Sequence, residues 1–306
     1  FNKKKISNSL ILNGPKGFGK ATFALNFINH LLDNNKKLNN NTSNLIYNNT
    51  HPNIRYIIRD IDEKNKKLKK NISVSQIRSL ENFLYQSTFN NLYKFIIIDS
   101  ADDLNISSSN ALLKILEEPK ENTYFILIAH QISNLLPTIR SRCIKFDFKK
   151  PTLNNFIKII KLYNNDIKIS DLEFLYSFTN GSPGLAISME SNKIKDLYDK
   201  ILQLLLTNKA LSYNVINISN IVSSFNDDEY KIFLLLIRYI LINLSKLNLG
   251  LDLEYSNSST SVNMADINID NYVILDILNY LNENEKNLFI YNLDKKYFCL
   301  NIFKSL

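Results

Sequence analysis

Hydrophobic residues in the first half of the chain form short continuous runs that alternate with stretches of helical spacing. Uninterrupted apolar runs are typical of strands covered on both faces, and their alternation with helices predicts a parallel α/β sheet. The three predicted strands are Ser9 to Leu12, Phe95 to Ile98 and Tyr124 to Ala129. Two polar segments, Asn34 to Thr50 and Asp62 to Asn71, are expected to be loops or hairpin tips.

The strand pattern ends at Pro151, and the rest of the chain has the apolar spacing of helices. A small helical unit is expected first, broken by the turn from Asn180 to Gly184. A longer helical region follows, interrupted by the Ser- and Asn-rich stretch from Tyr255 to Asn263. The sequence therefore predicts three domains: an α/β domain at residues 1–150, a helical lid at 151–200 and an all-α domain at 201–306.

The longest apolar stretch, Ile232 to Leu244, is short for a membrane span and contains Arg238, so we expect a buried helix and no membrane partner. No secretory signal is visible, and the chain opens at Phe1 just before a predicted strand, so we expect upstream sequence to be missing. Cys143 and Cys299 are too few and too far apart for a disulfide framework or a zinc site. A reducing, cytoplasmic location is expected.

A glycine-rich segment after the first predicted strand has the features of a phosphate-binding loop. Residues 14–20 are Gly-Pro-Lys-Gly-Phe-Gly-Lys, and a stretch of helical spacing follows. In such a loop, backbone N–H groups turn toward phosphate oxygens at a helix N-terminus, and the lysine reaches the terminal phosphates. The residues expected to bind a nucleotide, ATP or ADP, are Gly14, Pro15, Gly17, Gly19, Lys20, Ala21, Thr22 and Asp99.

The same segments depart from the pattern that holds a metal. Ala21 stands where a Ser or Thr hydroxyl would hold Mg²⁺, and Thr22 is rotated by about 100° around the helix. Asp99 ends a buried strand, where it could hold a metal through water or simply cap the strand. Ser100 follows it, where an ATPase needs a carboxylate to orient the attacking water. We therefore expect a degenerate phosphate loop with impaired Mg²⁺ positioning.

Two further segments stand out. Residues Asn110 to Pro119 predict a helix that is capped by Ser107 or Ser108 and ends at the proline, with leucines that fit a core. Arg140 and Arg142 are expected at the exit of a loop, where an isolated pair is typical of a solvated face or a local salt bridge.

The net charge is +8, from 37 Lys and Arg against 29 Asp and Glu, which favours a polyanionic partner such as nucleic acid or nucleotide phosphate. Most of the excess is lysine, and Asn and Ile are also abundant, as in sequences with A/T-biased codons, so the charge is weak evidence of binding. A lysine-rich stretch fits a solvated hairpin better than a DNA contact; its members are Lys64, Lys66, Lys67, Lys69 and Lys70.

In their order and spacing, four segments resemble bacterial clamp-loader AAA+ subunits, in particular the delta prime subunits of DNA polymerase III. They are the phosphate loop, the strand end Ile98 to Asp102, the helix Asn110 to Pro119 and the triplet Ser141-Arg142-Cys143. The resemblance covers Ser9 to Lys149 well, continues weakly to Gly184 and is only architectural beyond. The helix and the triplet are its specific parts, because many P-loop proteins share the rest.

The resemblance implies an AAA+ parallel sheet with helices on both faces, a small helical lid and an all-α collar. It implies a subunit of the polymerase holoenzyme, in a five-membered ring with gamma/tau motor subunits and a delta subunit, that places the sliding clamp on primed DNA. In that family Arg142, beside Ser141, would be a finger at the nucleotide site of the adjacent motor subunit. Ser108, Asn110 and Lys114 are weak candidates for DNA contact.

Three departures from the motor-subunit pattern agree with one another. Ala21 lacks the metal hydroxyl, Ser100 lacks the carboxylate, and Leu185 stands where motor subunits carry a basic sensor. Their agreement predicts a chain without ATPase activity that still serves its neighbour through Arg142. The zinc module of some relatives must be absent or metal-free, because residues 34–50 contain no Cys.

Two alternatives stay open. An active P-loop ATPase, such as a gamma/tau motor subunit, is disfavoured by Ala21 and Ser100. A sequence-tolerant DNA-binding module would bind primed DNA as an isolated chain, whereas a loader subunit would bind strongly only within the ring. His130, at the end of the third predicted strand, is expected to be structural, with a polar-sensor role as its alternative.

Overall fold

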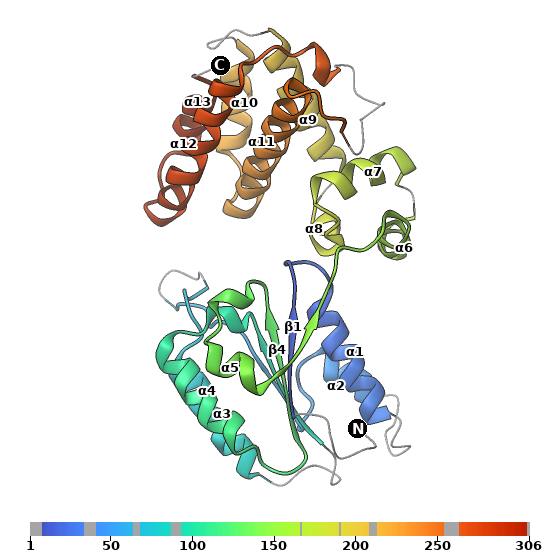
Figure 1. Cartoon of the computed structure of the whole chain (residues 1–306), viewed down its shortest axis with the longest axis vertical. Helices are drawn as coiled ribbons and strands as arrows, with labels where there is room; N and C mark the ends of the chain where they lie inside the picture. The colour runs from blue at the N-terminus through green and yellow to red at the C-terminus, as the bar shows by residue number, and fades with distance from the viewer. Residues whose placement is uncertain are drawn as a thin grey trace. The chain divides into compact units, whose positions relative to one another are not determined.

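The structure is a computed structural model that describes residues 8–33, 41–63, 68–86, 93–165, 167–189, 191–207, 213–253 and 263–304. The chain divides into two compact units, residues 1–150 and 151–306. The first is an α/β unit and the second is helical (Figure 1). The lysines at 64, 66 and 67, residues 34–40 of the first polar stretch and residues 255–262 of the Ser- and Asn-rich stretch lie outside the described residues.

Five parallel strands form the sheet of the first unit, in the order β2-β3-β4-β1-β5. Their bounds are β1 Ser9–Asn13, β2 Ile54–Ile57, β3 Lys94–Asp99, β4 Thr123–Ala129 and β5 Ile144–Asp147. The three predicted strands are β1, β3 and β4, which lie in the middle of the sheet. Asn13 of β1 aligns with Ala129 of β4 and Asp147 of β5, so the carboxyl ends of these strands meet at one edge.

Helices cover both faces of this sheet (Figure 1). The bounds of the helices are α1 Lys20–Asp33, α2 Asn41–Tyr47, α3 Val74–Tyr85, α4 Ile106–Glu117 and α5 Pro137–Arg142. Alternate strand residues point to opposite layers. Leu12 and Ile97 pack with residues of α1 and α2, whereas Ile11 and Ile96 pack with residues of α3, α4 and α5. The sheet is therefore covered on both sides, as its continuous apolar runs predict.

Three local expectations are wrong. A helix, α2, lies within the polar segment expected to be a loop, because Ile46 is buried against the sheet layer. Helix α4 begins four residues before Asn110, and its cap is Asn105, whose side chain accepts a hydrogen bond from the Ser108 N–H at 2.9 Å. The arginine pair lies on the short helix α5 instead of a loop exit, because Pro137 at its first turn favours helix initiation.

The second unit consists of helices packed around one hydrophobic cluster. Their bounds are α6 Leu153–Tyr163, α7 Ile169–Phe178, α8 Pro183–Ile187, α9 Ser191–Thr207, α10 Tyr213–Ser223, α11 Asp227–Asn248, α12 Asn271–Ile290 and α13 Lys295–Lys304. The predicted break at Asn180 to Gly184 lies between α7 and α8, where Asn180 and Gly181 have positive φ angles. The expected boundary at residue 200 falls within α9, and the division into lid and collar stays a prediction.

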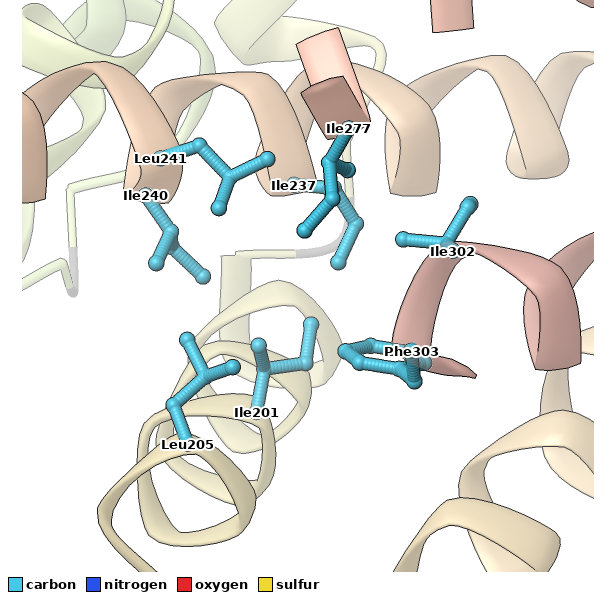
Figure 2. A pocket seen from close by; sticks show the side chains of 8 residues that line it. All are labelled: Ile201, Leu205, Ile237, Ile240, Leu241, Ile277, Ile302 and Phe303. Carbon is cyan, nitrogen blue, oxygen red and sulfur yellow. The ribbon is translucent and has the colours of Figure 1, made fainter. Parts of the chain in front are cut away.

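Helices α9, α11, α12 and α13 meet around a small apolar void (Figure 2). Its volume is about 10 Å³, and its lining includes Ile201, Ile237, Ile277 and Phe303. A buried water needs polar partners, which these side chains do not supply. The void is therefore part of a dry core and offers no chemistry.

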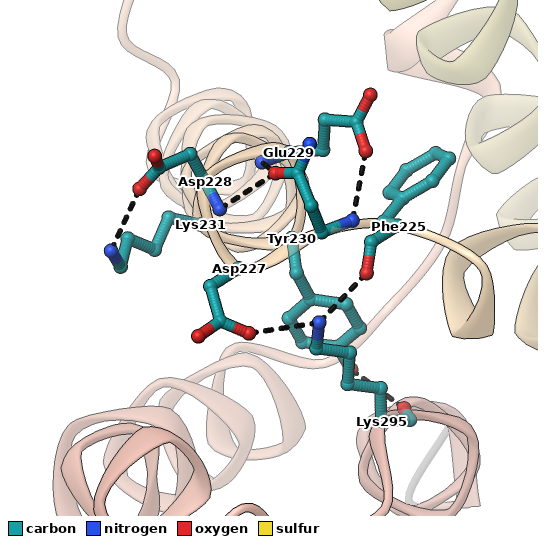
Figure 3. A network of polar contacts seen from close by, with 8 residues as sticks. Phe225, Asp227, Asp228, Glu229, Tyr230, Lys231 and Lys295 are labelled. Atoms are coloured by element: carbon teal, nitrogen blue, oxygen red, sulfur yellow. Dashed lines mark hydrogen bonds and ion pairs between the residues drawn. The ribbon is translucent and has the colours of Figure 1, made fainter. Parts of the chain in front are cut away.

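A polar network ties the start of α11 to the start of α13 (Figure 3). Lys295 Nζ lies 3.0 Å from Asp227 Oδ1 and donates a hydrogen bond to the Phe225 carbonyl at 2.7 Å. The buried Tyr230 hydroxyl donates to the Lys295 carbonyl at 2.8 Å. These contacts join the α10–α11 turn and the start of α11 to the first residue of α13.

Helix α11 contains the long apolar stretch, and it is a buried helix, as predicted. Arg238 pairs with Glu285 of α12 at 2.7 Å, which explains how a charged residue is accommodated among buried neighbours. In the described part of the chain, no helix has both the length and the apolar character that crossing a membrane requires.

Candidate nucleotide site and arginine finger

The phosphate loop connects β1 to α1 at the carboxyl edge of the sheet. Gly14 has a φ of 146°, and a side chain there would place its Cβ 2.7 Å from the Phe148 carbonyl oxygen. Only glycine therefore fits between the loop and the segment after β5. At Gly19, by contrast, a Cβ would meet nothing within 4 Å, so the loop faces open space beside the α1 N-terminus. This space is where phosphate oxygens could meet backbone N–H groups.

Lys20 is folded into the loop. It is 3% exposed, and its ammonium donates hydrogen bonds to the carbonyls of Gly14 and, at 2.7 Å, Pro15. Burial lowers the pKa of Lys20 to about 8, although the carboxylates of Asp99 and Asp102 raise it. The loop's own carbonyls thus hold the cation that the sequence predicts would reach the terminal phosphates.

Asp99 has a partner that the sequence does not reveal. The Tyr56 hydroxyl, from the edge strand β2, donates a hydrogen bond to Asp99 Oδ2 at 2.6 Å. Burial and this hydrogen bond raise the pKa of Tyr56, so the phenol stays protonated. One oxygen of Asp99, the carboxylate expected to hold a metal, therefore already accepts a hydrogen bond.

Ser100 and His130 lie together at the carboxyl ends of β3 and β4. Ser100 has a φ of 61°, and its Oγ is 3.1 Å from His130 Nε2. Asp102 accepts hydrogen bonds from the backbone N–H groups of His130 and Gln131, at 3.0 and 3.2 Å. Burial, and then the Lys20 cation, lower the pKa of His130. A hydroxyl that is paired with a neutral imidazole thus occupies the position expected of a water-orienting carboxylate.

These residues fit a nucleotide phosphate better than a metal. The open loop, the start of α1 and the Lys20 ammonium form one cationic, N–H-rich corner. Ala21 has no hydroxyl, the Thr22 side chain is exposed, and Asp99 is bonded to Tyr56. The loop N–H groups and the Lys20 ammonium would hold the phosphates of ATP or ADP. The bound nucleotide would contribute the negative charge of these phosphates to the site.

Arg142 is the last residue of α5, and its side chain is 38% exposed. Its Nη2 donates to Glu117 Oε1 of α4 at 2.6 Å, and its Nη1 donates to the Thr138 carbonyl at 3.1 Å. Ser141 Oγ donates to the same carbonyl at 3.0 Å. Burial raises the pKa of the Cys143 thiol to about 11, which keeps it protonated and favours a packing role.

Arg142 and the chain's own phosphate loop lie at opposite edges of the sheet. Arg142 precedes β5, whereas the loop follows β1, and these two strands are parallel with Leu10 aligned to Ile144. From Ile144 to Asp147 the strand rises about 10 Å. The structure therefore separates Arg142 from the loop at Gly14 and leaves its side chain partly exposed.

Comparison with known proteins identifies the family of this arrangement. The family described as "DNA polymerase III, delta subunit" matches residues 1–152. The delta′ subunit of DNA polymerase III from Pseudomonas aeruginosa is 29% identical over 195 residues, 62% of this chain and 58% of that protein. The delta′ subunit from Buchnera aphidicola subsp. Baizongia pistaciae is 35% identical over 113 residues, 37% of this chain and 34% of that protein. The chain is a delta prime-like member of the clamp-loader family.

A tau subunit of DNA polymerase III is also similar to part of this chain. The tau subunit from Bacillus subtilis is 30% identical over 193 residues, 61% of this clamp-loader chain and 33% of that protein. The chain therefore spans 58% or less of the length of each of these three relatives. A solved gamma subunit-related protein from Thermotoga maritima aligns with 98% of the chain and 94% of its own length, at 18% identity and a TM-score of 0.47. The assignment rests on the sequence matches.

The clamp-loader chain has the expected AAA+ sheet, with the phosphate loop after β1 and helices on both faces. It brings together the loop, Lys20, Asp99, Ser100 and His130, and it keeps Arg142 apart from them. The sequence did not predict that Tyr56 contacts Asp99 or that Glu117 pairs with Arg142. The signal for Glu117 was its place in the specific helix before Pro119, whereas Tyr56 lies 43 residues from Asp99 and carries no local signal.

Proposed function

We propose that this chain is the non-hydrolysing, delta prime-type subunit of a clamp loader. In that role it supports loading of a sliding clamp onto primed DNA and donates Arg142 to the ATP held by a neighbouring motor subunit. The observation that carries the proposal is the place of Arg142, exposed at the sheet edge opposite to the chain's own phosphate loop. A cation in that place acts on another molecule.

The residues around the chain's own phosphate loop support the proposal that this chain does not hydrolyse ATP. Hydrolysis needs a metal held in place and a water oriented toward the terminal phosphate. Ala21 lacks the metal ligand, Tyr56 binds the Asp99 carboxylate, and Ser100 pairs with His130. ATP or ADP bound by Lys20 and the loop would have a structural role, and Mg²⁺ would add little.

The proposed donation of Arg142 to a neighbouring subunit follows from the chemistry of its guanidinium group. Negative charge that builds on the phosphoryl oxygens during transfer is stabilised by a planar cation delivered across an interface, and such fingers are worth about 10³- to 10⁵-fold in rate. Ser141, which shares the Thr138 carbonyl with Arg142, would help to fix the end of α5. The reaction itself takes place on the neighbour.

The partners in this proposal are gamma/tau-type motor subunits, a delta subunit, the sliding clamp and primed DNA within the assembled ring. The α/β unit would face the clamp and DNA, residues 151–200 would form a lid, and residues 201–306 would form the collar that joins the subunits. Localisation to the cytoplasm stays a prediction.

The proposal is tested by reconstituting a loader with and without this chain. Clamp loading onto primed DNA should require the chain, while the isolated chain should hydrolyse no ATP in the presence of Mg²⁺. Mg²⁺-dependent turnover by the isolated chain that Lys20→Ala abolishes would contradict the non-hydrolysing role. Loading that proceeds equally well without the chain would contradict the whole proposal.

A further inference from the structure

The carboxylate of Glu117 holds the guanidinium of Arg142 before any neighbour is present. The two groups come from different elements, since Glu117 is the last residue of α4 and Arg142 is the last residue of α5. Their Nη2 and Oε1 atoms are 2.6 Å apart, and the Thr138 carbonyl accepts a second hydrogen bond from Nη1. Two acceptors on separate elements therefore fix the plane of the guanidinium.

Packing beneath the pair keeps the two helix ends in place. Ile139 of α5 is fully buried in the same hydrophobic cluster as Leu112 and Leu116 of α4. Because α5 is docked on α4 through this cluster, the distance between Glu117 and Arg142 does not depend on flexible segments.

Helix stability does not account for an acidic residue at this position. The C-terminus of a helix carries partial negative charge, so Glu117 is unfavourable at the end of α4, whereas Arg142 is favourable at the end of α5. The pair is also exposed, with side-chain exposures of 38% and 49%, and exposed ion pairs contribute little to folding. An orienting role explains the position better than a stabilising one.

We propose that Glu117 is a positioning residue for the Arg142 finger. A free arginine side chain samples many rotamers, and ordering it when a neighbour's ATP reacts costs conformational entropy. The contact with Glu117 orders the side chain beforehand, and it is weak enough to yield to the stronger charge of a triphosphate. This inference rests on the proposed donor function of Arg142.

The test is a double-mutant cycle in the reconstituted loader, with DNA-stimulated ATP hydrolysis as the readout. Glu117→Gln should lower kcat by about two- to fivefold, because an exposed ion pair orients only modestly, and should leave KM for ATP unchanged. Glu118→Gln is the matched control, since it removes the same charge at the same helix end and has no ion pair with Arg142 among the described contacts. Its kcat should equal that of the wild type.

In the Arg142→Ala background, Glu117→Gln should have no further effect, because the side chain that it positions is gone. Unchanged kcat in Glu117→Gln alone, or an equal loss in both backgrounds, would overturn the positioning role and leave the donor function standing. If Arg142→Ala itself leaves hydrolysis unchanged, the donor function fails, and the inference falls with it. The cycle thus distinguishes a failure of the positioning role of Glu117 from a failure of the donor function of Arg142.

Discussion

The Tyr56 hydroxyl donates a hydrogen bond of 2.6 Å to Asp99, the carboxylate expected to hold a metal. Tyr56 lies on the edge strand β2 and Asp99 at the end of the neighbouring strand β3, with Ile57 aligned to Ile98. Parallel pairing therefore brings the phenol to the carboxyl edge of the sheet. Together with the absence of a hydroxyl at Ala21, the contact gives a physical reason to expect impaired Mg²⁺ positioning.

Replacing Tyr56 by Phe tests this contact. Tyr56→Phe should lower the free energy of unfolding by about 1–2 kcal/mol, because a partly buried hydrogen bond to a charged group is lost. The pKa of Tyr56 is raised above 10.0, so its stabilisation is complete below that pH and is lost as the pH rises and the unfolded chain ionises. Urea unfolding at about pH 8 and about pH 11 should show the advantage of wild type over Tyr56→Phe shrinking at the higher pH. An advantage that does not change with pH would contradict this account.

Lys20 provides the second prediction. Lys20→Ala should weaken ADP binding to the isolated chain by about tenfold or more, because a charge-assisted contact to phosphate is lost. In the wild type, affinity should fall as the pH rises above about 8, where the ammonium of the free chain loses its proton. Fluorescence titration with a labelled ADP measures both effects.

The same variant should leave the reconstituted loader nearly intact. Because a nucleotide in this loop has a structural role, Lys20→Ala should keep DNA-stimulated hydrolysis within about twofold of wild type. A large loading defect would show that occupancy of this loop matters for the reaction.

Lys94 is a buried lysine at the start of β3 with a structural role. Its ammonium donates to carbonyls at the end of α3, at Phe83 (2.7 Å) and Leu84 (3.2 Å), and to the carbonyl of the capping residue Gln86. Lys94→Met should lower the free energy of unfolding by about 2–3 kcal/mol, because these acceptors lose their partner in a buried place. Urea unfolding measures the loss.

Lys120→Met is a matched control for that experiment. Lys94 Nζ lies 5.0 Å from the centroid of the Phe83 ring. Lys120 Nζ likewise lies 4.4 Å from the centroid of the Tyr85 ring, but Lys120 is exposed. Its replacement should change the free energy of unfolding by less than about 1 kcal/mol. Equal losses in the two variants would show that the ring contact, and not the carbonyl contacts, makes Lys94 important.

The central strands of the fold could be predicted because they are buried on both faces. β1, β3 and β4 have uninterrupted apolar runs, which mark them in the sequence. The edge strand β5, Ile144–Asp147, alternates apolar and charged residues over only four positions and carries no such signal. Helix α5 was also missed, because six residues are too few to show an apolar period.

The candidate site also has parts that the sequence predicts and parts that it does not. The loop from Gly14 to Lys20 is local in sequence, so its residues and their phosphate chemistry could be predicted. The contacts that decide how the site behaves join distant segments: Tyr56 to Asp99, Ser100 to His130, and Glu117 to Arg142. These pairs form only when strand order and helix packing bring the segments together. The spacing of residues along the chain therefore does not predict them.

The most direct test of the donor role is steady-state, DNA-stimulated ATP hydrolysis by a reconstituted loader that contains Arg142→Ala. Gel filtration first establishes that the ring assembles. Arg140→Ala is the matched control, because Arg140 is exposed on the same helix but is rotated by about 200° from Arg142. We predict a loss of at least about threefold in Arg142→Ala and none in Arg140→Ala, since one motor site loses its finger. Unchanged hydrolysis by an assembled ring with Arg142→Ala would contradict the account.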